Sequence, residues 1–128
     1  MDKIYLSTWS ITIMGFFKKM FGMEKPENAE INPVAAAGET DPDGGEIAAE
    51  RLGVNGEYDQ SGLAKRVSLA FDEDAAVTEV DTLWVAQTGG SVVLKGSVPS
   101  QEILDRMVEL ASGVSGTTDV AIDQVTVG

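Results

Sequence analysis

The sequence predicts an α+β domain of order α-β-β-α-β over residues 59–128, with a three-stranded sheet and two helices packed on one face. Three observations predict this fold. Two stretches carry apolar residues at helical spacing, three stretches alternate and are rich in β-branched residues, and a glycine pair separates the first two of these three. An apolar or amphipathic N-terminal segment (residues 1–23) and a flexible acidic linker (residues 24–58) precede the domain.

The first helix is predicted from apolar residues at i, i+4, i+7 and i+8, which are Leu63, Val67, Ala70 and Phe71. Either Asp59 or Ser61 can cap its start. The three acids at residues 72–74 oppose the helix dipole, so we expect the helix to fray by Phe71 or Asp72.

A β-hairpin is predicted next, with strands at residues 82–87 and 91–98. The intervening Thr88-Gly89-Gly90 supplies the positive φ angles that a tight turn needs. Alternation along the strands directs one set of side chains to a common face: Leu83, Val85, Val92, Leu94 and Val98.

The second helix is predicted to begin after Ser100, an N-cap residue that follows Pro99, with Glu102 in the favourable first turn. Gly113 is expected to form its C-cap. Its apolar stripe consists of Ile103, Leu104, Met107, Val108, Leu110 and Ala111. A last alternating strand is predicted over residues 120–127.

Composition excludes several classes of function. The 128 residues contain no Cys and no His, which removes thiol nucleophiles, disulfides, the usual zinc ligands and the commonest general base. The formal charge of −12 argues against nucleic acid as a partner, since phosphates require clustered Lys and Arg. Only residues 1–25 are net basic, at +2, while residues 26–58 and residues 59–128 each carry −7.

The apolar stretch of the N-terminal segment, Ile4–Phe17, has 14 residues, too few for a helix that spans a bilayer, which needs about 20. It is also a poor signal peptide, because Asp2 cancels the charge of Lys3. Met14 is an alternative start of the chain.

Residues 14–23 of this segment are predicted to form a short amphipathic helix, with two lysines beside an apolar face. A membrane surface or a partner protein would contact Phe16, Phe17, Lys18, Lys19, Met20 and Phe21. Alternatively, the apolar face packs onto the domain and completes its core. Two lysines give little electrostatic attraction, which favours packing.

The predicted linker contains three of the four prolines and nine acids, a composition typical of chain that does not form its own core. Residues 46–52 could form two turns of helix. Residues from Asp41 onward resemble a calcium loop, but its fifth and twelfth positions are Gly45 and Leu52, so a calcium site is excluded there.

The ordered set of elements resembles the BON domain of bacterial envelope, osmotic-stress and membrane-associated proteins. The resemblance depends on the strand at residues 92–98 with its glycine, on Pro99-Ser100 with the helix that follows, and on residues 113–120 leading into the last strand. It covers about 70 of the 128 residues. The resemblance implies a non-enzymatic binding module.

A narrower resemblance is to small bacterial potassium-binding proteins that join a BON domain to a LysM domain and begin with a stretch like residues 14–17. This sequence departs from them in two ways: it stops at Gly128, where a LysM domain would follow, and it contains the acidic linker. The resemblance implies K⁺ as the only cofactor, held by backbone carbonyls of Met20, Phe21, Met23, Ser112, Val114 and Thr117. For residues 113–119, the alternative is an ordinary helix-to-strand connection.

Catalysis is not expected. Residues 72–74 are consecutive acids, whereas Glu102, Asp105 and Glu109 follow the spacing of a solvated helix face, and no phosphate-binding glycine loop is present.

Three functional hypotheses therefore remain: binding of a monovalent cation, attachment to a membrane surface through the N-terminal segment, and membership of a larger assembly, such as a membrane protein complex, into which that segment inserts. We expect a cytoplasmic location, peripheral at the inner membrane under the second hypothesis.

Overall fold

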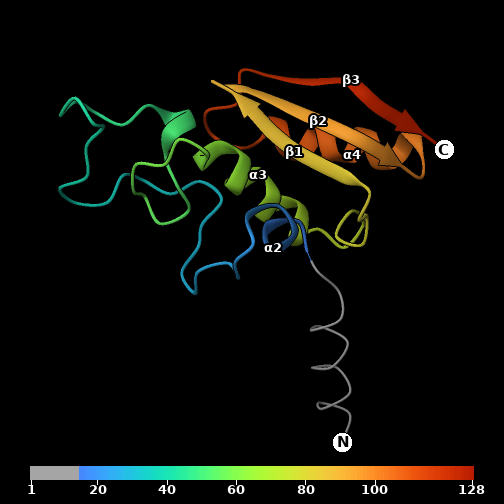
Figure 1. Cartoon of the computed structure of the whole chain (residues 1–128), viewed down its shortest axis with the longest axis horizontal. Helices are drawn as coiled ribbons and strands as arrows, with labels where there is room; N and C mark the ends of the chain where they lie inside the picture. The colour runs from blue at the N-terminus through green and yellow to red at the C-terminus, as the bar shows by residue number, and fades with distance from the viewer. Residues whose placement is uncertain (1–14) are drawn as a thin grey trace, which may run out of the picture.

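The computed structural model describes residues 15–128, which form one mixed sheet, two long helices, and shorter pieces laid against them (Figure 1). The predictions for residues 1–14 lie outside the described residues. The elements are α2 (Phe16–Phe21), the 3₁₀ helix η1 (Ala49–Arg51), α3 (Gly62–Asp72), β1 (Leu83–Thr88), β2 (Ser91–Val98), α4 (Gln101–Ser112) and β3 (Asp119–Val127).

The sheet has the strand order β1-β2-β3, with β2 antiparallel to β1 and parallel to β3. The predicted hairpin is confirmed: Thr88 pairs with Ser91, and Gly89 in the turn between them has φ of 59°. The parallel pair β2–β3 is connected through α4, which such a pair requires.

Both long helices cover the same face of the sheet, as predicted (Figure 1). The five side chains expected to share the inner face of the hairpin are all buried. They meet Leu63, Val67 and Phe71 of α3 and Leu104, Met107 and Ala111 of α4 in one core. The α+β fold class predicted from periodicity is thus confirmed, because every regular element has one apolar side to bury.

Gly96 is required by the packing of β2 against the start of β1. Its φ is +120°, and a Cβ atom placed on it would lie 2.2 Å from the carbonyl oxygen of Thr82. The close approach is held by Ser97 N–H, which donates to that same oxygen, and by Thr82 Oγ1, which donates to the Ser97 carbonyl. Only glycine fits this position.

Helix α4 begins and ends at the predicted residues. The Ser100 hydroxyl accepts a hydrogen bond from Ile103 N–H at 3.2 Å, which confirms the N-cap. Gly113 follows the helix but has φ of −83°, so it is not in the left-handed conformation common at helix ends. The positive φ occurs at Gly116 instead, where the chain turns toward β3.

Residues 24–58, expected to be a linker, are mostly irregular chain laid against the domain. Only residues 49–51 of the helical stretch predicted at residues 46–52 are helical. Ile47 and Val54 are buried, and Ile31 packs on both hydrophobic clusters. A few apolar side chains and backbone carbonyls of this segment therefore anchor it, while most of its acids face solvent.

Candidate functional site

Helix α2 is docked on the domain by its two phenylalanines. Phe16 is 1% exposed and meets Phe71 edge to face, with ring centroids 5.2 Å apart. Phe17 is 2% exposed and packs with Val54 and Leu69. This arrangement corresponds to the packing alternative, and it directs both rings away from any outer partner.

Asp72, the last residue of α3, caps the start of α2. Its carboxylate accepts hydrogen bonds from Phe16 N–H at 2.6 Å and from Phe17 N–H at 3.0 Å. A Cβ atom on Gly15 would lie 2.6 Å from this carboxylate, so a larger residue there would require the Asp72 side chain to shift. Helix α3 extends to Asp72. The negative charge of Asp72 is unfavourable at the C-terminus of α3 but favourable at the N-terminus of α2.

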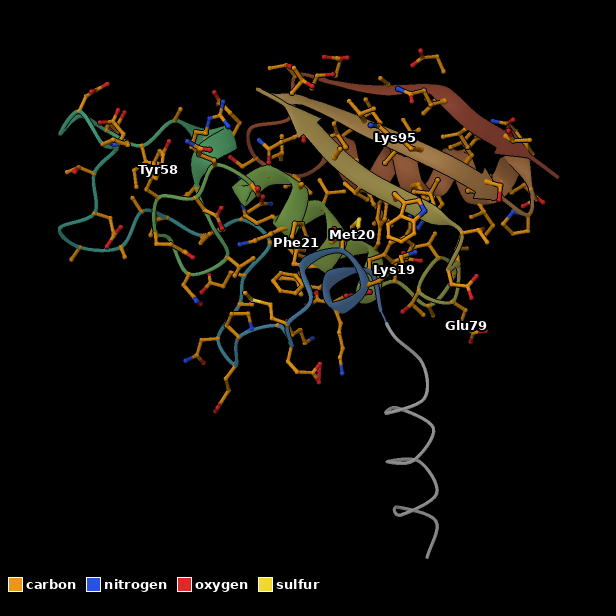
Figure 2. All side chains as sticks on the ribbon, viewed as in Figure 1. Lys19, Met20, Phe21, Tyr58, Glu79 and Lys95 are labelled. Atoms are coloured by element: carbon orange, nitrogen blue, oxygen red, sulfur yellow. The ribbon has the colours of Figure 1, made fainter. Side chains whose placement is uncertain are left out.

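The outer edge of β1 is covered by two side chains of α2 (Figure 2). Lys19 Nζ donates to the carbonyl of Leu83 at 2.9 Å and to that of Asp81 at 3.0 Å, and Val85 N–H donates to Met20 Sδ. Burial lowers the pKa of Lys19, against the opposing influence of nearby Asp81 and Asp72. An edge strand that would otherwise expose unpaired backbone groups is blocked in this way.

The six residues expected to contact a membrane or partner therefore have different roles in the structure. Phe16 and Phe17 are in the core, Lys19 and Met20 bond to the edge of β1, and Phe21 is half-buried beside Phe17. Lys18 keeps an exposed side chain. Beyond α2, Met23 is 48% exposed and Lys25 is exposed.

Arg66 is a buried cation that the sequence analysis did not single out. It is 0% exposed, and its guanidinium donates to four backbone carbonyls: Ile31, Ala49, Leu52 and Ser115. Burial lowers its pKa. Its burial could have been predicted from its position, since Arg66 lies at i+3 from Leu63, within the apolar stripe of α3.

The residues expected to hold potassium form two groups. In the loop after α4, the Val114 carbonyl accepts from Thr117 N–H, and Thr117 Oγ1 is buried without a hydrogen-bond partner. Asn32, from the acidic segment, binds this loop at Gly113 and Ser115. Among residues 15–128, no hydrogen bond joins this group to Met20, Phe21 or Met23.

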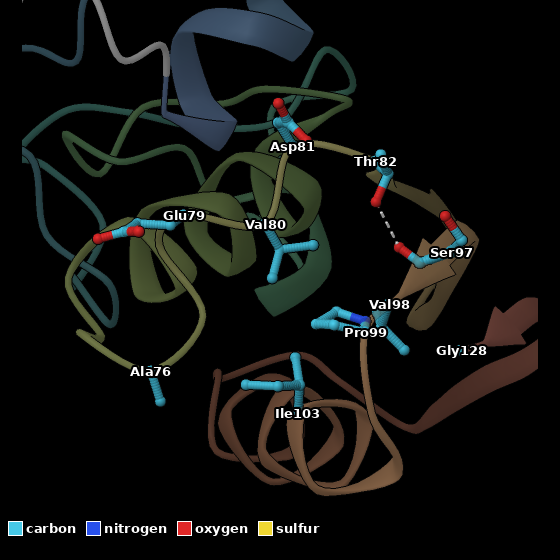
Figure 3. A pocket seen from close by; sticks show the side chains of 10 residues that line it. All are labelled: Ala76, Glu79, Val80, Asp81, Thr82, Ser97, Val98, Pro99, Ile103 and Gly128. Atoms are coloured by element: carbon cyan, nitrogen blue, oxygen red, sulfur yellow. Dashed lines mark hydrogen bonds between the residues drawn. The ribbon is translucent and has the colours of Figure 1, made fainter.

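The acids of the domain do not converge on a cavity. A hollow of about 400 Å³ lies between the segment before β1 and the start of α4, with Val80, Pro99 and Ile103 in its wall. Figure 3 shows the carboxylates of Glu79 and Asp81 directed away from these side chains. On α4, Arg106 donates hydrogen bonds to Asp74 and Glu109. The bond from Arg106 lowers the pKa of Asp74.

Within residues 15–128, no three acidic side chains are grouped as metal ligands. None of the helices described there is long and apolar enough to cross a bilayer.

The fold and its side chains define a small α+β module with a covered edge at β1, a carbonyl-binding arginine and no convergent acids. The BON domain family model matches residues 59–128, which is more than half of the chain. The protein belongs to the BON domain family. Domains of this family are generally non-enzymatic and are associated with membrane or phospholipid binding, so a binding role is supported in general.

Proposed function

We propose that this protein is a non-enzymatic BON-domain protein that attaches to an anionic membrane surface through α2 and the apolar residues before it. The observation that carries the proposal is the fixed position of α2. Its buried phenylalanines and the Asp72 cap hold it on the domain. Lys18 is exposed, with its ammonium 3.7 Å from Glu24, and the exposed Met23 and Lys25 follow the helix in sequence. Residues 1–25 are also the only net basic part of a chain of charge −12.

The apolar side chains for such an attachment are supplied by residues 4–14. This stretch contains Ile, Leu, Tyr, Trp and Met residues and no charge, and it directly precedes Gly15 and α2. Apolar burial combined with attraction of lysines to anionic lipid is the usual basis of interfacial binding. A fixed α2 would then orient the BON domain relative to the bilayer.

Vesicle flotation tests this proposal. The full chain is expected to float with phosphatidylglycerol vesicles and much less with phosphatidylcholine vesicles. Ile11→Glu should reduce the floated fraction several-fold, because a charge in the inserted stretch is costly. Val34→Glu is the matched control, since Val34 is 85% exposed in the acidic segment and the charge change is equal.

Equal loss in both variants would show that net charge alone governs flotation and would overturn the role of residues 4–14. Absence of flotation with either lipid would overturn the proposal.

A second candidate is binding of a monovalent cation by the loop after α4. The buried, unpartnered Thr117 hydroxyl supports it, since such a group usually bonds to a water or an ion. Membrane attachment is preferred because Arg66 already places a positive charge on Ser115 of the same loop.

Isothermal calorimetry separates potassium from sodium at this site. Cation binding predicts heat on addition of KCl that NaCl does not produce and that Thr117→Val reduces. No difference between the two salts would remove this candidate.

A further inference from the structure

Among residues 15–128, no helix or loop covers the face of the sheet opposite the two helices (Figure 1). By strand register, its outward positions are those that alternate with the buried residues of β1 and β2 and their partners on β3. Most carry small apolar, hydroxyl or amide side chains. Only Lys95 and Asp119 are charged at these positions, in a protein with 21 acids.

The one aromatic side chain on this face is Trp84, which is 47% exposed. It lies directly across from Lys95 in the β1–β2 register. The ammonium of Lys19 lies 4.5 Å from the Trp84 ring centroid, so the ring also contacts α2. Trp84 thus connects the outer face of the sheet to the lysine-bearing helix.

The outward positions carry no net charge, since Asp119 offsets Lys95, and the positive charge of this face lies at its Trp84 end. Asp119 lies at the far end of β2 and β3, where it accepts from the Ser91 hydroxyl. Asp123 falls in the irregular part of β3 and has no partner in the register with β2. Asp81 is exposed just before β1, and its backbone carbonyl accepts from Lys19.

We propose that the outer face of the sheet, centred on Trp84 and Lys95, is the surface through which the BON domain lies on an anionic phospholipid bilayer. This inference rests on the proposed function and specifies which face of the domain contacts lipid. Tryptophan prefers the polar–apolar boundary of a bilayer, where its ring is buried and its N–H remains hydrated.

Charge complementarity selects the bilayer as the occupant of this face. Lys95 would face lipid phosphates, together with Lys19 at the rim of the Trp84 ring. The acids of α4 project from the opposite layer, so a bilayer against the sheet avoids them.

The chain has two tryptophans, so the full-length Trp9→Phe variant makes Trp84 the sole tryptophan emitter. With phosphatidylglycerol vesicles, its emission is expected to shift to shorter wavelength and to be quenched by brominated lipid. Phosphatidylcholine vesicles should produce neither effect. A floating chain whose Trp84 emission is unchanged would overturn this inference and leave the proposed function intact.

Charge reversal provides a second measurement. Lys95→Glu should weaken partitioning into phosphatidylglycerol vesicles by about an order of magnitude, because each basic residue near the lipid surface contributes to binding. Arg106→Glu carries the same charge change on α4, in the layer away from the sheet face, and should have a much smaller effect. Equal effects would mean that only net charge matters and would overturn the assignment of this face.

Two further outcomes separate this inference from the proposed function. A shift of Trp84 emission that persists in the Ile11→Glu, Trp9→Phe double variant would support the sheet face and overturn the N-terminal anchor. A protein that neither floats nor changes its emission would remove both. If a co-purified protein changed the Trp84 emission and vesicles did not, the partner of this face would be a protein. That result would overturn the inference.

Discussion

Arg66→Met is expected to lower the free energy of unfolding by at least about 3 kcal/mol, because it removes the guanidinium that donates to backbone carbonyls of three separate segments, at residues 31, 49–52 and 115. Methionine retains much of the apolar stem and removes only the guanidinium. Urea denaturation followed by circular dichroism measures the difference. Arg66→Lys should recover only part of the loss, since one ammonium cannot reproduce the planar fork of donors.

Arg106→Met is the matched control for the loss of an arginine. Arg106 is 45% exposed in its side chain and bonds to carboxylates at the surface, so its replacement should cost far less. Equal losses for the two variants would contradict the role of Arg66 as the group that ties residues 31, 49, 52 and 115 to α3. The expected loss should also be accompanied by faster amide exchange around these residues.

Phe16→Ala is expected to lower the free energy of unfolding by about 3–5 kcal/mol. The phenylalanine is almost fully buried and contacts Phe71 in the main core, so its removal leaves a cavity between α2 and α3. Thermal or urea unfolding of the full chain measures this loss. The result bears on function, because a docked α2 presents Lys18 in a fixed place.

Met23→Ala is the control for this experiment, since Met23 lies just beyond α2 and is 48% exposed. It should change the stability by well under 1 kcal/mol. If Phe16→Ala were no more destabilising than Met23→Ala, α2 would not be part of the core. Its apolar face would then be free for a membrane or a partner, as the competing interpretation of the sequence supposes.

Helix α2 and the acidic segment are attached to the domain in different ways. The apolar face of α2 is buried in the core, and the acidic segment is joined through the backbone bonds of Arg66 and Asn32. The BON match begins at residue 59, yet the described core includes Phe16. The structural unit is therefore larger than the part that the family model covers.

The sequence by itself determined the sheet and its two helices. Helical and strand periodicity, the Gly89–Gly90 turn and the Ser100 cap are local properties, so residues close in sequence suffice to predict them. Chain order then placed both helices on one face, because each has a single apolar side to bury. These elements correspond to the region in which the family resemblance was recognised.

Only the tertiary structure decided how residues 15–58 relate to the domain. The hydrogen bonds of Asp72 to α2, of Arg66 to residues 31 and 115, and of Lys19 to the edge of β1 join residues 35–64 positions apart. Spacing in sequence carries no signal for such pairs, because backbone carbonyls and amides are present at every position. A composition rich in acids and prolines predicted a linker, whereas a few distant polar contacts and buried apolar side chains placed this segment on the domain.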